Sequence, residues 1–368
     1  MFGSNIQWSK NQELIMVEEL TYLSEREKLV LYAVVKNFIL TANPVASSLI
    51  SRSGSFSLSP ATIRNIMAQL EEKGYIYQPH TSSGRVPTNT GYRIFVDQMM
   101  KRNRLSSEEK EKIRQAVNFG SGLYDDILRE SSRILAHLSH QLSVIVSPHL
   151  GEGIFQRMDI NRLGSNRLLL IIYIRSGIVK TILLEIESDI PSKKIDILSQ
   201  LLNERLQGLK INEIRTKFKE IIHDISPEST ELLHLFVDSA EKIFDFSENS
   251  EVFLTGTHNF IRQPEFSNFE EVSGVVEALE DKNVIIHLLD QSQMIPDLNV
   301  LIGEEIKDTK MKKCSIITAR YKIGQVKGTL GIIGPTRMDY SYLIPLVEYT
   351  AQTISESVEI NLSYKSLT

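Results

Sequence analysis

The residues best suited to chemistry lie in one short segment, residues 61–69. At about 100° per residue, six of them fall on one side of a helix, opposite an apolar side. The six are Ala61, Thr62, Arg64, Asn65, Ala68 and Gln69. In the major groove of DNA, Asn and Gln can pair with adenine, Arg with guanine, and Ala or a Thr methyl can contact a thymine methyl. The pattern therefore favours a helix that reads base edges, with an ordinary solvated helix face as the alternative.

A polar loop with a glycine for a tight turn follows this helix. It combines hydroxyl groups, backbone N–H groups and an arginine around Gly84, and a second arginine stands just beyond it. Groups of these kinds contact phosphates, and an arginine can enter the minor groove. The residues expected to contact DNA here are His80, Thr81, Ser82, Ser83, Arg85 and Arg93. A loop of this composition is by itself usually only a connection, so the prediction depends on the loop and the helix together.

Three helices and a strand must position these two segments. The first helix begins at a capping-box pattern in residues 24–27, and a short second helix is expected at residues 45–52. The third begins with a Ser-Pro pair and ends before a glycine, over residues 59–74, and a strand follows at residues 75–78. This order predicts a winged helix-turn-helix over residues 21–104.

The remainder of the chain mixes helices and strands. Helical patterns cover residues 107–119, 122–141, 191–246 and 341–364. Strand patterns cover residues 142–147, 153–161, 167–175, 178–186, 252–254, 284–290, 300–302, 315–321 and 326–333. Because strands flank the long helical block, the expected fold class is α+β multidomain, with one α/β domain interrupted by a helical insertion. The expected domains are an N-terminal extension (1–20), the winged helix-turn-helix (21–104), the interrupted domain (105–187 and 249–368) and the insertion (188–248).

The net charge of −5 is unevenly distributed. Residues 1–104 contain 12 Lys and Arg against 8 Asp and Glu, whereas residues 105–368 contain 29 against 38. A basic head attracts phosphates and an acidic body repels them, which orients the protein on nucleic acid. A single cysteine, no pattern of a secretory leader and a longest apolar run of seven residues (168–174) favour a soluble cytoplasmic protein with no membrane segment.

Taken together, these motifs resemble the HrcA family of bacterial heat-inducible transcription repressors. The resemblance is carried near the N-terminus by residues 60–71, 74–76, 79–88 and 91–93. It continues at residues 255–260, 264–266, 302–305, 315–321 and 331–340. Ala46 departs from the family, which usually has glycine there, and the first 20 residues fall outside the family pattern.

The resemblance implies properties that the residue patterns do not show. Members of the family are dimers that bind an inverted-repeat operator ahead of chaperone genes and repress them. They have a winged-helix head, a GAF-like domain and a dimerising insertion within that domain. The GroEL chaperonin is expected to support their activity, and no cofactor is expected.

Other candidate sites are weaker. Gly328, Gly331 and Gly334 match no nucleotide-binding loop, and turn or close-packing roles are favoured. His137 and His140 lack nearby ligands, so no metal site is predicted, and no spacing of residues indicates a catalytic site. Two alternatives to an operator-binding repressor remain: a metabolite-sensing regulator with a small effector in the GAF-like domain, and an enzyme with a basic substrate-binding head.

Apolar residues of the insertion are expected to supply part of a dimer interface, because an inverted repeat is matched by a two-fold symmetric protein. The alternative is that they only close the insertion onto its own domain. These residues are Ile195, Leu198, Leu201, Leu202, Leu206, Leu232, Leu233, Leu235 and Phe236.

Overall fold

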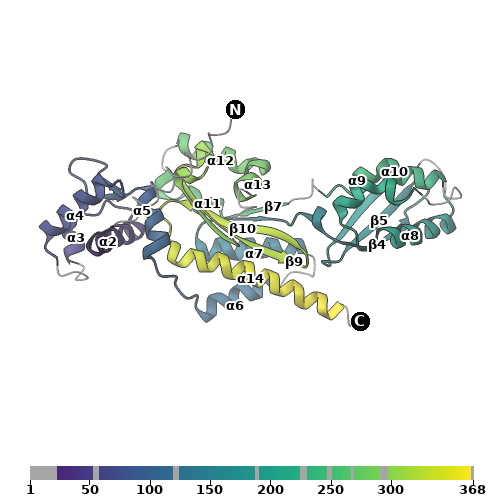
Figure 1. Ribbon diagram of the computed structural model, residues 1–368, viewed down its shortest axis with the longest axis horizontal. Coiled ribbons are helices and arrows are strands. Elements are labelled where there is room, and N and C mark those ends of the chain that lie inside the picture. Colours follow the sequence, from purple (N-terminus) through teal and green to yellow (C-terminus); the bar gives the residue numbers. More distant parts are fainter. Residues whose placement is uncertain are drawn as a thin grey trace, which may run out of the picture. The chain divides into compact units, whose positions relative to one another are not determined.

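The computed structural model describes most of the chain as two compact units of mixed helices and strands (Figure 1). The described residues are 23–52, 58–118, 124–186, 190–223, 230–246, 251–266, 269–290 and 297–365. The first unit contains the chain up to Asn103 together with Ile302–Glu305 and Thr336–Ser341, and the second unit contains the rest. The expected N-terminal extension lies outside the described residues. The mixed α+β fold class is confirmed at this level.

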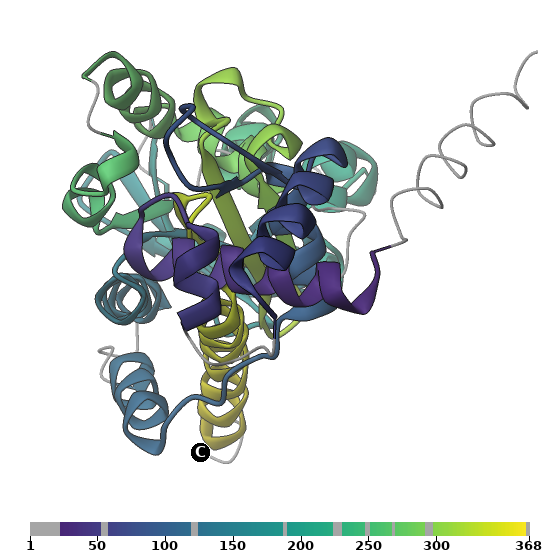
Figure 2. The ribbon, with the colours of Figure 1, turned by 90° about the vertical axis from the view of Figure 1, so that its left-hand side faces the viewer.

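Three helices form the body of the first unit: α2 (Glu25–Thr41), α3 (Ser47–Arg52) and α4 (Pro60–Glu72) (Figure 2). The predicted capping box is present, since the Ser24 hydroxyl accepts from the Glu27 amide and the Glu27 carboxylate accepts from the Ser24 amide. The apolar sides of the helices pack on one another with no exposed surface at Val34, Ile50 and Ile63. Burial of these sides fixes which side of each helix faces solvent.

A small antiparallel sheet adjoins the helices. Strands β1 (Ile76–Tyr77) and β2 (Val86–Pro87) pair directly. Val45 extends the sheet, because its amide and carbonyl both exchange 2.9 Å hydrogen bonds with Arg85. Gly84 lies so close to the backbone of Val45 that a β-carbon would collide with it. The predicted glycine therefore serves close backbone approach as well as the turn.

Two segments from far along the chain complete the first unit. These segments are Ile302–Glu305 and Thr336–Ser341. They join the chain that runs through helix α5 (Asn89–Ile94) and the π-helical turn η1 (Phe95–Met99) to Asn103. The Asn103 amide donates to the Ser341 carbonyl at 2.8 Å. The Arg337 guanidinium donates to the Ile39 carbonyl at the end of α2, at 2.9 Å. The unit is therefore larger than the continuous stretch 21–104 expected from sequence.

The second unit is built on a five-stranded sheet in the order β7-β3-β10-β9-β8. Its strands are β3 (Leu142–Val146), β7 (Val252–Thr255), β8 (Leu298–Ile302), β9 (Cys314–Ile323) and β10 (Val326–Pro335). Its helices are α6 (Ser107–Asn118), α7 (Tyr124–Ser139), α11 (Thr257–Ile261), α12 (Phe269–Glu280), α13 (Lys282–Asp290) and α14 (Tyr340–Lys365). Short 3₁₀ turns lie at η2 (Leu150–Glu152), η4 (Pro264–Phe266), η5 (Gly303–Glu305, in the first unit) and η6 (Thr309–Met311). A buried apolar cluster joins α11–α13 to one side of the sheet.

One predicted strand is wrong. Residues 284–290 form most of helix α13. Asp281 accepts hydrogen bonds from the amides of Asn283 and Val284, which begins the helix, and Ile285, Leu288 and Leu289 are buried on one side of it. A short apolar run fits a buried strand and a buried helix equally well, so only its packing partners decide between them.

Residues 155–243, which we call the insertion from here on, contain their own sheet, whereas the sequence pattern predicts an insertion that begins only at residue 188. Strands β4 (Phe155–Arg162), β5 (Arg167–Ile174) and β6 (Val179–Glu185) hydrogen-bond to one another as a separate antiparallel sheet. The predicted helices follow as α8 (Ser192–Leu206), α9 (Ile211–Ile221) and α10 (Thr230–Ile243), and α8 packs on β4. The expected boundary at residues 187/188 therefore divides the sheet from the helices that cover it. Among the described helices of the whole chain, none has the length and hydropathy to cross a membrane.

Glu27 joins the capping box of α2 to α4 and gives a test of the first unit. Burial alone would raise the pKa of Glu27, but hydrogen bonds from Lys73 (2.6 Å) and Ser24 (2.8 Å) outweigh burial and hold this pKa below its ordinary value. Glu27→Gln should therefore lower the free energy of unfolding by about 1–2 kcal/mol at pH 7. The loss should be full above the ordinary carboxyl pKa of about 4.3 and should disappear as the pH falls through the lower folded-state pKa.

Denaturant unfolding at a series of pH values measures this effect. Glu25→Gln is the matched control, because Glu25 is exposed and its ion pair with Lys28 should contribute less than about 1 kcal/mol. Equal losses in the two variants would contradict the role assigned to Glu27.

Candidate nucleic-acid interface

The predicted outward side of α4 is outward in the structure. Ala61, Arg64, Asn65, Ala68 and Gln69 are all exposed. The opposite side is buried, as the periodicity predicted, at Ile63, Ile66, Met67 and Leu70. Five short or hydrogen-bonding side chains therefore stand clear of the protein on one helix.

Thr62 differs from the other five residues. It is half-buried, and its hydroxyl lies 2.9 Å from that of Ser59, which also accepts from the Thr62 amide at the start of α4. The hydroxyl is thus engaged in capping the helix, and the methyl group is the part of Thr62 left for an external contact.

The loop after β1 presents an exposed tip formed by His80, Thr81 and Ser82. Ser83 lies behind the tip, where its hydroxyl donates to the His80 carbonyl (2.7 Å) and accepts from the His80 amide (3.1 Å). The Gln78 side chain donates to the carbonyls of Thr81 and Ser83 at 2.9 and 3.0 Å. Ser83 therefore holds the turn together, and three of the four predicted loop residues before Gly84 remain open to solvent.

Arg85 is held by the protein itself. Its guanidinium pairs with the Glu71 carboxylate of α4 at 2.8 Å, and the side chain is only 21% exposed. The same carboxylate accepts from the Gln78 amide at 3.0 Å. The charge of Arg85 is thus paired within the first unit, and its contact with a DNA groove stays a prediction. Arg85 fixes the loop to α4.

Arg93 is also engaged within the first unit. Its guanidinium forms an ion pair with Glu305 and a second one with Asp97 at 3.2 Å. Burial would lower the pKa of Arg93, but the two carboxylates raise it above its ordinary value. Arg93 therefore links α5 to η5, and its contact with a phosphate stays a prediction.

Sequence reasoning missed Glu71, Gln78 and Glu305. Gln78 could have been suspected, since it is polar and directly precedes the loop, and Glu71 could have been suspected as an acidic residue at the end of α4. Nothing local points to Glu305, which lies 212 positions from Arg93. A partner at that separation is visible only once the fold is known.

The other candidate residues show packing roles. Gly328 lies against the ring of Tyr321, and Gly331 lies against the carbonyl of Ile317, with no room for a β-carbon at either. The rings of His137 and His140 are 6.5 Å apart, and no group of three or more His, Cys, Asp or Glu able to hold a metal occurs among the described residues. Burial raises the pKa of Cys314 to about 12, so its thiol is unreactive near neutral pH.

Comparisons with known proteins agree with these observations. A family model described as the HrcA protein C terminal domain matches residues 125–344. A heat-inducible transcription repressor HrcA of Chlorobium phaeobacteroides (strain BS1) is 38% identical over 349 residues, covering 91% of this chain and 98% of the relative. The chain belongs to the HrcA family.

Further relatives cover the chain equally well. A repressor HrcA of Geobacter sulfurreducens is 35% identical over 341 residues and covers 92% of this chain and 99% of its own length. A crystal structure of a hypothetical protein shares the fold, with a TM-score of 0.62 and 24% identity over 92% of this chain and 99% of the other. The family is thus one of heat-inducible transcription repressors, and the fold of this member is shared with a solved protein.

The Arg93–Glu305 pair should contribute to stability. Arg93→Ala and Glu305→Ala should each lower the free energy of unfolding, and the double variant should lose less than the sum by about 1 kcal/mol, because the second change removes a partner already lost. Denaturant unfolding of the four proteins measures this coupling. Arg26→Ala, at an exposed arginine of α2, is the control. Weakened DNA binding with unchanged stability in Arg93→Ala would instead make Arg93 a phosphate contact.

Proposed function

We propose that this HrcA-family protein is a cytoplasmic, non-enzymatic repressor that binds an operator ahead of chaperone genes and blocks transcription by occupying it. In this proposal the first unit is a winged helix-turn-helix, with α4 as the recognition helix and the loop at residues 78–85 as the wing. The single observation that carries the proposal is the exposed side of α4, which has no acidic residue between Ala61 and Gln69. A side of this kind can enter the major groove, about 12 Å wide, without repelling phosphates.

Each exposed residue has a proposed task. Arg64 would pair with guanine, and Asn65 and Gln69 with adenine. The methyl groups of Ala61, Thr62 and Ala68 would contact thymine methyl groups. The wing tip (His80, Thr81 and Ser82) would contact phosphates through side-chain and backbone donors. Arg85 and Arg93 would act indirectly, by holding the wing and α5 in place.

We also propose that the protein binds an inverted repeat as a homodimer, through a surface other than the one the sequence suggested. Ile195, Leu198, Leu202, Leu206 and Phe236 are buried within one chain, so they cannot form a subunit interface. Leu201, Leu233 and Leu235 are half-buried, and the side chain of Leu232 lies outside the described residues. These residues therefore pack α8 and α10 onto the rest of the insertion.

The side of the insertion sheet that faces away from α8 is a better interface. Alternation along β5 buries Leu168, Leu170 and Ile172 and leaves Leu169, Ile171 and Tyr173 partly exposed. In β6, Val179 (49% exposed) lies opposite Tyr173, and Leu183 (43% exposed) lies opposite Leu169. An apolar surface of this kind on a soluble protein is typical of a contact with another protein.

The edge of this surface suits a second copy of the same chain. Arg157 and Asp159 of β4 lie beside it, 3.4 Å apart, and the Arg157 guanidinium stacks over the Tyr173 ring at 4.1 Å. A surface that carries both charge signs around an apolar centre can be self-complementary under two-fold rotation. Two winged helices related in this way would match two half-sites of an inverted repeat.

The family resemblance supports one more element of the proposal. The GroEL chaperonin would keep the repressor active, so that repression lapses when heat diverts the chaperonin to unfolded clients. Repression measured with normal and depleted chaperonin tests this element separately from DNA binding.

Recognition by α4 predicts a specific loss. Arg64→Ala or Asn65→Ala should weaken operator binding by about 1–3 kcal/mol and relax preference at one base pair, because each removes a base contact and no packing. Binding assays on the operator and on single-base variants at fixed salt measure both effects. Lys219→Ala, at an exposed lysine of α9 in the second unit, is the control. Unchanged affinity in both variants would show that α4 is not the recognition helix.

The dimer surface predicts a change of association state. Ile171→Asp, at the centre of β5, should convert the dimer to monomer and weaken binding to the full inverted repeat, since an unpaired carboxylate would be buried at the interface. Sedimentation at micromolar concentration measures the state. Lys193→Asp, on the exposed surface of α8, introduces the same charge and should remain a dimer. A dimeric Ile171→Asp variant would place the interface elsewhere.

A further inference from the structure

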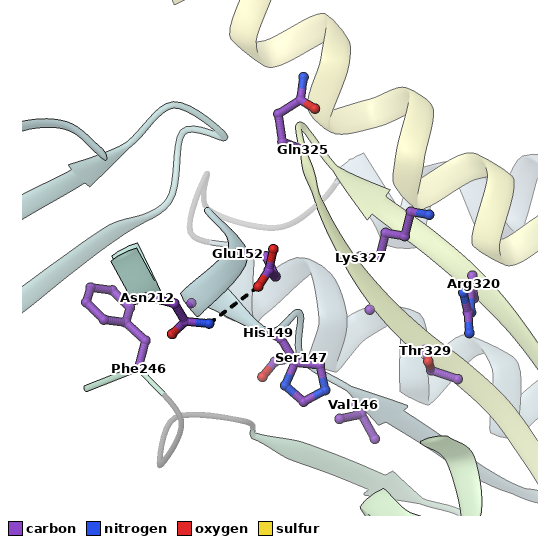
Figure 3. A pocket seen from close by; sticks show the side chains of 12 residues that line it. Val146, Ser147, His149, Glu152, Asn212, Phe246, Arg320, Gln325, Lys327 and Thr329 are labelled. Carbon is purple, nitrogen blue, oxygen red and sulfur yellow. Dashed lines mark hydrogen bonds between the residues drawn. The ribbon is translucent and has the colours of Figure 1, made fainter. Parts of the chain in front are cut away.

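The second unit contains a pocket that DNA binding does not use. Its volume is about 620 Å³, within the usual range of small-molecule sites. Figure 3 shows that its walls come from the segment after β3, from α9, from the chain after α10 and from the β9–β10 hairpin. The lining residues are Val146, Ser147, His149, Gly151, Glu152, Asn212, Phe246, Arg320, Gln325, Lys327, Gly328 and Thr329.

The hairpin wall concentrates positive charge. Register places Arg320 opposite Thr329 and Lys322 opposite Lys327. Because side chains alternate along a strand, these four project from the same side of the sheet. Two lysines directly opposite each other repel, which costs stability unless an anion lies between or beside them. Lys327 is exposed and forms no ion pair with any residue that the structure describes.

The negative charge of the pocket wall is already neutralised. Among the described residues that line it, Glu152 is the one acid, and its carboxylate accepts from Lys210 at 2.9 Å and from Asn212 at 3.4 Å. The hydrogen bond from Lys210 and its charge hold the pKa of Glu152 below its ordinary value, so the pair stays ionised at neutral pH. Lys327 therefore faces a cavity in which the described carboxylate is already paired with Lys210.

The rest of the lining can orient a ligand. Thr329 is buried, with 7% of its surface exposed, and its hydroxyl lies on the strand next to Arg320. Phe246 and Val146, both buried, supply apolar surface. Convergent polar groups on a partly apolar wall are typical of a site for a small organic molecule.

We propose that this pocket binds a small anionic metabolite, whose phosphate or carboxylate group lies between Lys327, Arg320 and Thr329. The site does not depend on the proposed operator binding, because every residue that forms it belongs to the second unit. It would make the protein responsive to a metabolite in addition to heat.

Thermal unfolding and calorimetric titration of the full-length protein without DNA test the proposal. Pyrophosphate represents the phosphate class, citrate represents the carboxylate class, and potassium chloride at equal ionic strength controls for charge screening. One of the two anions should raise Tm by about 3–8 °C at saturation, beyond the effect of chloride. The anion that does so identifies the chemical class of the ligand.

Two variants locate the site. Lys327→Gln should weaken binding of that anion on the order of tenfold, and Thr329→Val should weaken it several-fold, because each removes one contact. Lys193→Gln, at an exposed lysine of α8, should bind as the unaltered protein does. The Tm of each variant without ligand reports whether folding is intact.

The proposal would be overturned if neither anion shifted Tm beyond the chloride control, or if both pocket variants bound like the unaltered protein. Operator affinity is measured on the same samples. Intact operator binding with no anion binding would reject the pocket alone, whereas the reverse result would reject the recognition helix alone.

Discussion

The Glu71 carboxylate is the contact on which the geometry of the candidate interface depends. It holds Arg85 and the Gln78 amide at once, and so joins α4 to the loop that follows β1. Charge-assisted hydrogen bonds of this kind are stronger than neutral ones, and the loss of one partner leaves the other partly buried and unpaired. Through Glu71, Arg85 and Gln78, the helix with the exposed side and the loop with the exposed tip are therefore joined to each other.

A second constraint comes from chain connectivity. The first unit is completed by one segment that begins with the last residue of β8 and by another that directly follows β10. Arg93 binds the first of these segments, and Asn103 and the end of α2 bind the second. The fold of the first unit therefore depends on partners that lie 212, 238 and 298 positions apart along the chain.

Local sequence patterns predicted most of the helices and strands. Ion pairs and sheet pairings depend on residues far apart in the chain, and the sequence did not predict them. The buried and exposed sides of α4 followed from periodicity and its caps, because both depend on residues within a few positions. Helix α13 was predicted as a strand, because its apolar run has no feature that separates the two structures without its packing partners. The ion pairs of Arg85 and Arg93 were not predicted for the same reason, since a carboxylate partner of a charged side chain on a basic segment is not visible in the local sequence. The sheet of the insertion was recognised strand by strand, but its separation from the larger sheet depends on pairings that spacing does not reveal.

The insertion shows how burial changes a functional argument. Leucines at helical spacing in α8 fit a subunit interface and an internal core equally well, and the structure assigns Leu198, Leu202 and Leu206 to the core. An interface must then be sought among apolar residues that the chain itself leaves exposed. Strands β5 and β6 supply them because α8 covers only one side of a three-stranded sheet, and alternation forces every second side chain to the other side. A sheet with one covered side and one apolar open side has surface left to bury, and a second copy of the same sheet is the partner we propose for it.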